Sequence, residues 1–258
     1  MTGIVKSLSE NRLVISAMVE RNLKGRYRNS AIGIAWNILM PVLLIFAVWL
    51  VFTQVKTYRS EADFWIYLSV GMFAMSTCSN CIRGRAIINN SNYIKKIAIP
   101  RWVEVLSDAI AQFITLGISY ILLIIVTLAC GHHLDITILV FMPVSFILLF
   151  ITCLGFLMLF STLNVVNNDV GHLMIVISRI AVWLTPVFFF MNEAEGLLRT
   201  VAVCNPFTYI VEVLHQVIYW AEVPDLGYLG MAALIAFIAF AFGWVVFSHY
   251  EKNLAEML

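Results

Sequence analysis

The sequence predicts an all-α polytopic membrane protein with six transmembrane helices. Hydrophobic residues make up 62% of the 258 positions and charged residues only 12%, whereas a soluble domain has roughly half and a quarter. The mean hydropathy is +0.92. Six apolar runs of about 20 residues, the length that crosses a bilayer, follow one another along the chain. This composition excludes a secreted enzyme, a disordered scaffold and a cytosolic globular protein.

Residues 1–30 are predicted to form an amphipathic helix at the membrane interface. Residues 7–10, Ser-Leu-Ser-Glu, fit a capping box that opens a helix, Glu20 and Lys24 form a favourable i,i+4 pair, and Gly25 is a plausible stop. An apolar stripe follows the helix: Val14, Ile15, Met18, Val19 and Leu23. A stripe of this width opposite charged residues is typical of a helix lying in the membrane surface, although a soluble lid helix has the same pattern.

Residues 31–258 are predicted to form one transmembrane domain. Its six spans are residues 31–53, 64–82, 103–130, 136–160, 170–190 and 226–248. The third and sixth are the clearest, because Ile110–Cys130 and Leu226–Ser248 carry no formal charge. The second is the least regular, because three serines and an asparagine dilute it. Such side chains usually face other helices, so we expect this span at the centre of the bundle.

The segment between the fifth and sixth spans, Met191–Asp225, does not fit a simple six-helix count. Its apolar part, Phe207–Trp220, has 14 residues, too few to cross a bilayer. Asn205 and Pro206 precede it and break the chain direction. We therefore expect re-entrant helices, with residues 205–220 dipping into the outer half of the bilayer and packing on the bundle or lining a cavity.

The positions of Lys and Arg predict that both chain ends are cytoplasmic. One side of the membrane has twelve of these residues, in the N-terminal segment, the loop between the second and third spans and the C-terminal tail. The other side has three, Lys56, Arg59 and Arg199. The re-entrant segment is therefore expected on the external side.

The sequence has no recognisable motif for catalysis or nucleotide binding. A phosphate-binding loop, a Gly-x-Ser-x-Gly elbow and a His-Glu-x-x-His zinc helix are all absent. We interpret His132 and His133 as an interfacial turn, and Cys78 and Cys81 as packing residues at the inner end of the second span. No catalytic residue, metal site or cofactor is therefore expected in this chain.

Arg179 lies nine positions into the fifth span, close to mid-membrane by helical rise, where a charge needs a polar partner. Two interpretations remain open. The guanidinium pairs with Asp108 or with backbone carbonyls, or it faces an aqueous path and binds phosphate or sugar hydroxyls.

Aromatic residues make up 13% of the chain, and many lie at span ends, as expected of an interfacial belt. Phe46, Trp49 and Phe52 instead recur at every third position of the first span. This stripe either packs against neighbouring helices or offers sugar rings a smooth lining. Together with Trp36 and Arg179, these three residues are our candidates for a substrate path.

Four stretches of the chain resemble the ABC-2 type export permeases. Residues 26–36, Arg-Tyr-Arg-Asn-Ser-Ala-Ile-Gly-Ile-Ala-Trp, followed by Pro41, are similar to the segment leading into the first span of those permeases. Residues 95–101, Lys-Lys-Ile-Ala-Ile-Pro-Arg, resemble the loop between their second and third spans. The residues of the leading segment that carry the likeness are Arg26, Arg28, Ser30, Ile32 and Gly33.

The other two stretches lie in the second half of the chain. Residues 160–164, Phe-Ser-Thr-Leu-Asn, with Asp169 and the Thr-Pro pair at 185–186, resemble the fourth and fifth spans of the family. Asn205 and Pro206 match its external Asn-Pro. Because the four stretches keep the family order over about 200 residues, the resemblance covers nearly the whole chain.

Three positions depart from the family pattern. Ile32 replaces a Leu before Gly33. Asn168 stands where an Arg before Asp169 is common, and His215 stands where the external helix often has Arg. Any role of those arginines in relatives does not carry over to this chain.

The resemblance is closest to permeases that export lipid-linked polysaccharides such as O-antigen, capsule and teichoic acid. It implies a single ABC-2 type transmembrane domain, a homodimer, and two copies of a separate ATPase subunit that binds ATP and Mg²⁺. It also implies a cytoplasmic coupling helix between the second and third spans, for which the candidate residues are Arg85, Tyr93, Lys95, Lys96 and Arg101. The substrate would be an undecaprenyl-linked glycan that crosses the bacterial inner, or plasma, membrane between the two subunits.

Other classes of function are weaker matches. An ABC-2 exporter of a small hydrophobic drug or lipid is the alternative within transport, although many such permeases have a large external domain that this sequence lacks. An integral membrane transferase would need clustered Asp, Glu or His residues at a membrane face, and the sequence has no such cluster. A receptor or structural protein is compatible with the composition alone. No feature indicates a nucleic-acid partner.

Overall fold

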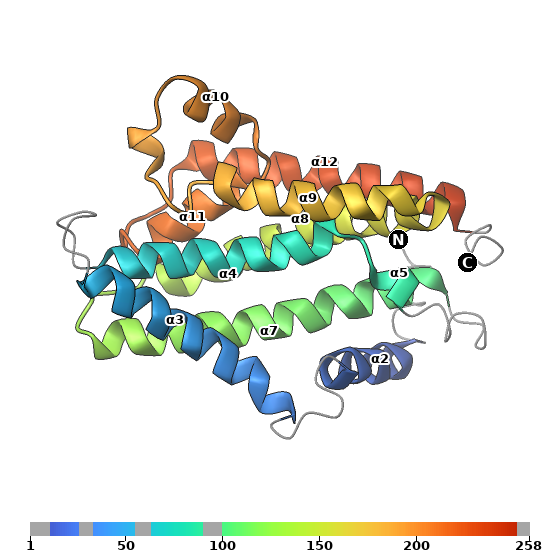
Figure 1. The fold of residues 1–258 in the computed structure, drawn as a ribbon, viewed down its shortest axis with the longest axis horizontal. Helices are drawn as coiled ribbons and strands as arrows, with labels where there is room; N and C mark the ends of the chain where they lie inside the picture. The colour runs from blue at the N-terminus through green and yellow to red at the C-terminus, as the bar shows by residue number, and fades with distance from the viewer. Residues whose placement is uncertain (1–10, 26–32, 55–62, 90–99, 252–258) are drawn as a thin grey trace.

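Long helices running side by side make up the bulk of the protein in the computed structural model, which describes residues 11–25, 33–54, 63–89 and 100–251 (Figure 1). The long helices are α3 (Trp36–Gln54), α4 (Phe64–Ile82), α7 (Arg101–Ala129), α8 (Ile138–Val166), α9 (Asn168–Leu184) and α12 (Leu226–Tyr250). The short elements are α2 (Arg12–Gly25), η1 (Gly33–Ala35), α5 (Ala86–Asn89), η2 (Met191–Glu193), α10 (Gly196–Cys204) and α11 (Thr208–Ile218). Those ranges contain no strand, which confirms the predicted all-α class for that part of the chain.

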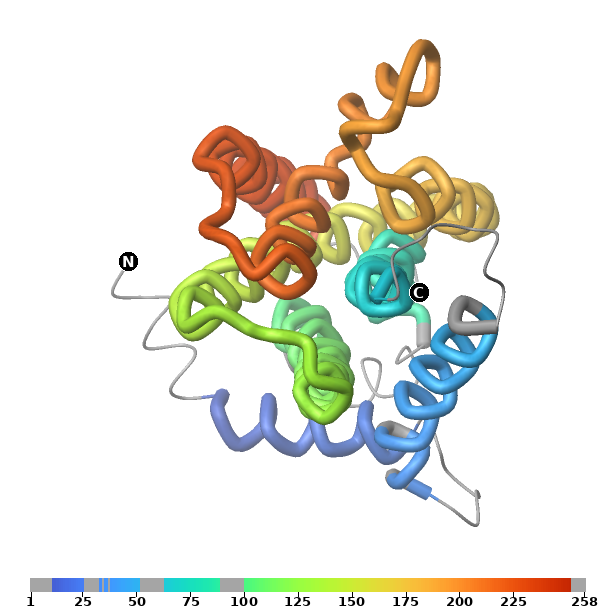
Figure 2. Tube along the Cα trace, turned by 90° about the vertical axis from the view of Figure 1, so that its left-hand side faces the viewer, coloured from blue at the N-terminus to red at the C-terminus, as the bar shows by residue number. Residues whose placement is uncertain are grey.

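The bundle has two ends with different short elements (Figure 1). We call them the α2 end, where α2 and α5 lie, and the α11 end, where α10 and α11 lie. Helix α2 packs on α7 and lies crosswise to the long helices (Figure 2). It ends at Gly25, the predicted stop, while the predicted capping box at residues 7–10 lies outside the described residues.

Helix α4 lies at the centre of the bundle, as its serines predicted. It contacts α3, α7, α8, α9 and α11, and large side chains such as Trp65 and Tyr67 are at most 2% exposed. The prediction was wrong for half of the polar residues that motivated it. Ser69 and Ser79 are buried, whereas Ser76 and Asn80 are exposed.

Three of the described helices, α7, α8 and α12, are long and apolar enough to cross a membrane. Helices α10 and α11 would add a fourth crossing only if the pair, bent by 97°, formed one span. Helices α3 and α4 have 19 residues each and α9 has 17, so they lie near the lower limit of length for a span.

The fifth predicted span, residues 170–190, is longer than the helix that forms there. Helix α9 begins two residues earlier, at Asn168, where the Asn167 side chain accepts a hydrogen bond from the Asp169 amide at 2.9 Å. It ends at Leu184, because Pro186 has no amide hydrogen to continue the helix and Thr185 is already extended. The chain then turns towards η2 and α10 (Figure 1).

The segment before α12 contains two short helices. Helix α11 lies inside the predicted re-entrant range of residues 205–220, and the bend before it falls at the predicted Asn-Pro. Helix α10 precedes that range, and the sequence analysis assigned it no bounds because its nine residues mix apolar with polar positions.

Two glycines allow α8 and α12, the most extensively packed pair of helices, to approach backbone to backbone. A Cβ atom added to Gly155 would overlap the backbone of Ala239 and Phe240, and one added to Gly243 would overlap the backbone of Gly155. Small residues at such crossings are a common means of helix packing in membranes.

We therefore expect Gly243→Ala to destabilise the protein by about 1–3 kcal/mol, because the new methyl group forces the two helices apart. Thermal unfolding of the detergent-solubilised protein measures the effect. Gly230→Ala is the matched control, since no atom lies within 4 Å of its added Cβ and alanine favours the helix. An equal melting temperature for Gly243→Ala and wild type would contradict the close packing.

Candidate functional site

One side of α4 is left open by the helices around it. Met72 is half-buried and Ser76 and Asn80 are exposed, and their spacing of four places them on one helix face. We call these three residues the α4 stripe. Helix α4 contacts α3, α7, α8, α9 and α11, and the exposure of Ser76 and Asn80 shows that none of these helices covers the stripe.

Helix α3 presents two of the predicted path residues on its exposed side. Phe46 is 54% exposed and Trp49 is 38% exposed, and their rings stack with centroids 6.1 Å apart. Ile45, in contrast, is 3% exposed and packs into the core. Trp36, at the start of α3, is half-buried, and the Phe52 side chain lies outside the described part of the structure.

Arg179 is exposed on α9 and has no hydrogen bond or ion pair within the described residues. Its neighbour Ser178 is buried against Ser79, and the adjacent Cys78 contacts Cys153 in the middle of α8, so Arg179 lies near the middle of the bundle. Asp108, on α7, instead accepts a hydrogen bond from Gln112 on its own helix at 2.9 Å. The pairing of Arg179 with Asp108 is therefore not found.

Hydrogen bonds fix the end of α4 to both α8 and α9. The Ser79 hydroxyl donates to the Ser178 carbonyl at 3.2 Å, and Nε of Arg83 donates to the Ser178 hydroxyl at 3.4 Å. The side-chain amide of Asn164 donates to the backbone carbonyls of Arg83 and Gly84, each at 3.0 Å. Gly84 has φ = 56°, and a Cβ there would overlap the backbone of Phe160, so only glycine fits this turn.

Three of the candidate coupling residues, Tyr93, Lys95 and Lys96, lie within residues 90–99, outside the described structure. The other two, Arg85 and Arg101, flank this range. Arg85 is exposed immediately before α5, and Arg101 is half-buried at the start of α7. Both described residues lie at the α2 end of the bundle.

Helix α2 is fixed to the same end by an ion pair. Nη2 of Arg21 lies 2.6 Å from Oε1 of Glu104 on α7, whose side chain is 2% exposed. Met18 and Val19 are buried beneath the helix. On its exposed side Lys24 pairs with Glu20, as predicted, and this contact lowers the pKa of the Glu20 carboxyl.

The segment that leads from α2 into α3 is described only from Gly33 onward. Gly33 has φ = 58°, a backbone conformation that favours glycine. The candidates Arg26, Arg28, Ser30 and Ile32 lie outside the described residues.

Asn205 and Pro206 form the bend between α10 and α11. The side-chain amide nitrogen of Asn205 donates to the Thr185 hydroxyl at 2.8 Å. The side-chain oxygen of Asn205 accepts from the backbone amide of Phe207 at 3.1 Å. Asn205 therefore connects the bend to the end of α9.

A buried polar cluster at the α11 end was missed by the sequence analysis. The Tyr67 hydroxyl donates to the carbonyls of Pro186 and Phe189, each at 2.9 Å, and lies 3.4 Å from Oε1 of Glu212. Nε2 of His215 donates to the Tyr67 carbonyl at 3.0 Å, and the two rings stack at 3.6 Å. Glu212 and His215 are polar residues three apart in an apolar helix, which is the signal that could have found them.

Of the histidine pair and the cysteine pair noted in the sequence, His133 is exposed and the other three residues are at least half-buried. His132 bridges Asp63 and the Tyr219 carbonyl, with 3.1 Å between the bonded atoms in each case. Cys78 and Cys81 are fully buried, in agreement with the predicted packing role.

Comparison with known proteins supports the resemblance. The model of the ABC-2 type transporter family matches residues 14–219. The O-antigen export system permease protein RfbA of Myxococcus xanthus is 24% identical over 99% of this chain and 98% of its own length. Two O-antigen export system permease proteins RfbA of Klebsiella pneumoniae are 21% and 19% identical, each over 95% of both chains. The family match spans most of the chain, including α4 and the Asn205 bend, and the protein therefore belongs to the ABC-2 type transporter family.

Proposed function

We propose that this chain is the permease subunit of an ATP-driven ABC exporter that moves a lipid-linked polysaccharide of the O-antigen, capsule or teichoic acid type out of the cytoplasm. The observation that carries the proposal is the end-to-end similarity to O-antigen export permeases. These alignments cover 95% or more of this chain and of each relative.

The proposed topology has six spans, α3, α4, α7, α8, α9 and α12, in a bacterial inner or plasma membrane. The α2 end is cytoplasmic, because the described basic residues Arg12, Arg21, Lys24, Arg85 and Arg101 lie in α2, beside α5 and at the start of α7. Helix α2 then rests on the cytoplasmic membrane surface, with its buried residues against α7. Helices α10 and α11 enter from the external side and return.

Membership in the family implies a partner subunit that binds ATP, and we infer two copies of it on a homodimer of this chain. The segment from Arg85 to Arg101 is the proposed contact, since it is basic and leaves α4 at the cytoplasmic end. The bonds from Asn164 and Ser79 join the end of α4, which leads into this segment, to α8 and α9. Movement of the ATPase subunits would therefore reach the spans directly.

The proposed glycan path follows the α4 stripe and the exposed sides of α3 and α9. Phe46 and Trp49 offer aromatic faces for sugar rings. Arg179 offers a fixed cation along this path for the diphosphate of an undecaprenyl carrier.

Loss of the gene in its native host should remove the exported glycan from the cell surface and leave its undecaprenyl-linked precursor in the inner membrane. Mass spectrometry of extracted lipids and surface labelling of whole cells measure the two quantities. Wild-type complementation should reverse both effects. Normal surface glycan together with lost resistance to hydrophobic compounds would instead assign the chain to a small-molecule exporter.

The re-entrant topology predicts the labelling of single cysteines in an otherwise cysteine-free chain. Cysteines at the exposed positions Glu195 and Glu222, on either side of α10 and α11, should both react with an impermeant maleimide in intact spheroplasts. A cysteine at the exposed Asn168 should react only after permeabilisation. Labelling of Glu195 and Glu222 from opposite sides would refute six spans.

Arg179→Ala should lower export about tenfold or more while the amount of folded protein stays unchanged, because no described residue pairs with the exposed guanidinium and would lose its partner. Arg179→Lys should retain part of the export, since lysine keeps the positive charge but lacks the paired N–H donors with which arginine binds a phosphate. Ile180→Ala, at an adjacent exposed position, is the control. If Arg179→Ala instead lowers the yield and Asp108→Asn restores it, Arg179 is a structural residue.

A further inference from the structure

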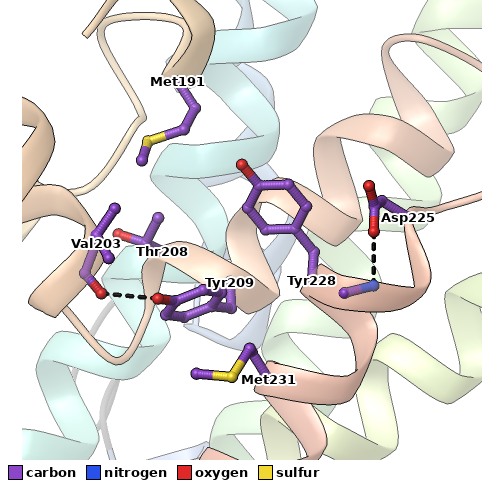
Figure 3. Close-up of a pocket in the computed structure, with 8 residues that line it drawn as sticks. Met191, Val203, Thr208, Tyr209, Asp225, Tyr228 and Met231 are labelled. Atoms are coloured by element: carbon purple, nitrogen blue, oxygen red, sulfur yellow. Dashed lines mark hydrogen bonds between the residues drawn. The ribbon is translucent and has the colours of Figure 1, made fainter. Parts of the chain in front are cut away.

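A cavity of about 320 Å³ opens beside the first turns of α12, away from the α4 stripe. Residues from η2, α10, α11 and α12 line it (Figure 3). The lining residues are Met191, Val203, Thr208, Tyr209, Asp225, Gly227, Tyr228 and Met231. None of them belongs to the proposed glycan path.

Two tyrosine rings form the aromatic part of the cavity. The ring centroids of Tyr209 and Tyr228 lie 6.0 Å apart, tilted by 46°. The Tyr209 hydroxyl donates to the Val203 carbonyl at 2.9 Å, which holds this ring in place (Figure 3). The thioethers of Met191 and Met231 complete an aromatic and polarisable lining.

Three oxygen atoms of the lining are left for a ligand. The Thr208 side chain is fully buried, and its hydroxyl has no hydrogen-bond partner. No hydrogen bond joins the Tyr228 hydroxyl to the described part of the chain. Asp225 uses one carboxylate oxygen to cap α12, accepting from the Gly227 amide at 2.6 Å, and its other oxygen accepts no hydrogen bond from the residues that the structure describes.

The charge of the lining favours a cation. Asp225 is the charged residue among the eight, so a bound ammonium would gain both its carboxylate and the faces of two tyrosines. A primary ammonium has three N–H donors, and the free oxygen of Asp225 and the hydroxyl of Tyr228 are acceptors in the same lining. A neutral sugar would use the rings and hydroxyls but not the charge.

We propose that this cavity binds the primary ammonium of a phospholipid headgroup of the phosphatidylethanolamine type. The surroundings suit such a lipid. Leu226, Val223 and Leu197 are 78%, 61% and 80% exposed at this end of the bundle, where acyl chains would cover them. Arg199 is exposed one turn before the lining residue Val203 on α10 and supplies a positive charge for the headgroup phosphate.

Native mass spectrometry of the purified full-length chain with defined lipids tests the site. Wild type should retain phosphatidylethanolamine in preference to phosphatidylglycerol, which lacks the ammonium. Asp225→Asn should weaken that retention about tenfold, because the amide oxygen still caps α12 while the charge is lost. Thr208→Val should weaken it about threefold through the lost hydroxyl. Glu222→Gln, an equal loss of charge in the same loop, should have no effect.

Unchanged thermal unfolding would show that Asp225→Asn and Thr208→Val remain folded. Equal retention of phosphatidylethanolamine by wild type and by both variants would overturn the proposal. Retention of phosphatidylglycerol or of a neutral galactolipid as strongly as phosphatidylethanolamine would also overturn it, and the galactolipid result would assign the cavity to sugar instead. Neither outcome depends on whether the chain exports a glycan.

Discussion

The need to satisfy every backbone polar group inside hydrocarbon governs this structure, because water is absent there to replace a lost partner. Helices meet the need along their length but not at their ends. In this protein three polar side chains bind the backbone at or beyond helix ends. Asn164 binds the carbonyls after α4, Asn205 binds the end of α9, and Tyr67 binds the turn after it.

The same requirement makes α4 a mechanical link between the two ends of the bundle. At the α11 end, Tyr67 contacts the turn after α9 and stacks on His215 of α11. At the α2 end, Arg83 and Gly84 are bound by α8 and α9. In the proposed exporter, the coupling segment follows α4 directly, so a shift imposed on that segment would be transmitted along α4 to the re-entrant helices.

Sequence reasoning located the helices better than it located their contacts. The apolar run at residues 64–82 coincides with α4, and Asn205 marks the bend before α11, because composition and proline act locally. The end of α9 was placed six residues too late, since apolar residues continue past Pro186 in a turn that buries them. The contact between Tyr67 and His215 joins residues 148 positions apart. No local pattern contains that information.

The exposed surfaces of the bundle differ in polarity, and therefore in the surroundings that they require. On α12, Phe237, Ile238 and Val245 are 71%, 55% and 64% exposed, and lipid chains satisfy such a face without further structure. The side formed by α3, α4 and α9 exposes Asn80 and Arg179 among its apolar residues, and hydrocarbon would penalise both. That side therefore needs either a second protein surface or water against it. A homodimer that encloses a polar path would provide both, which is why the exposure of Arg179, and not its burial, favours the proposed route for the glycan.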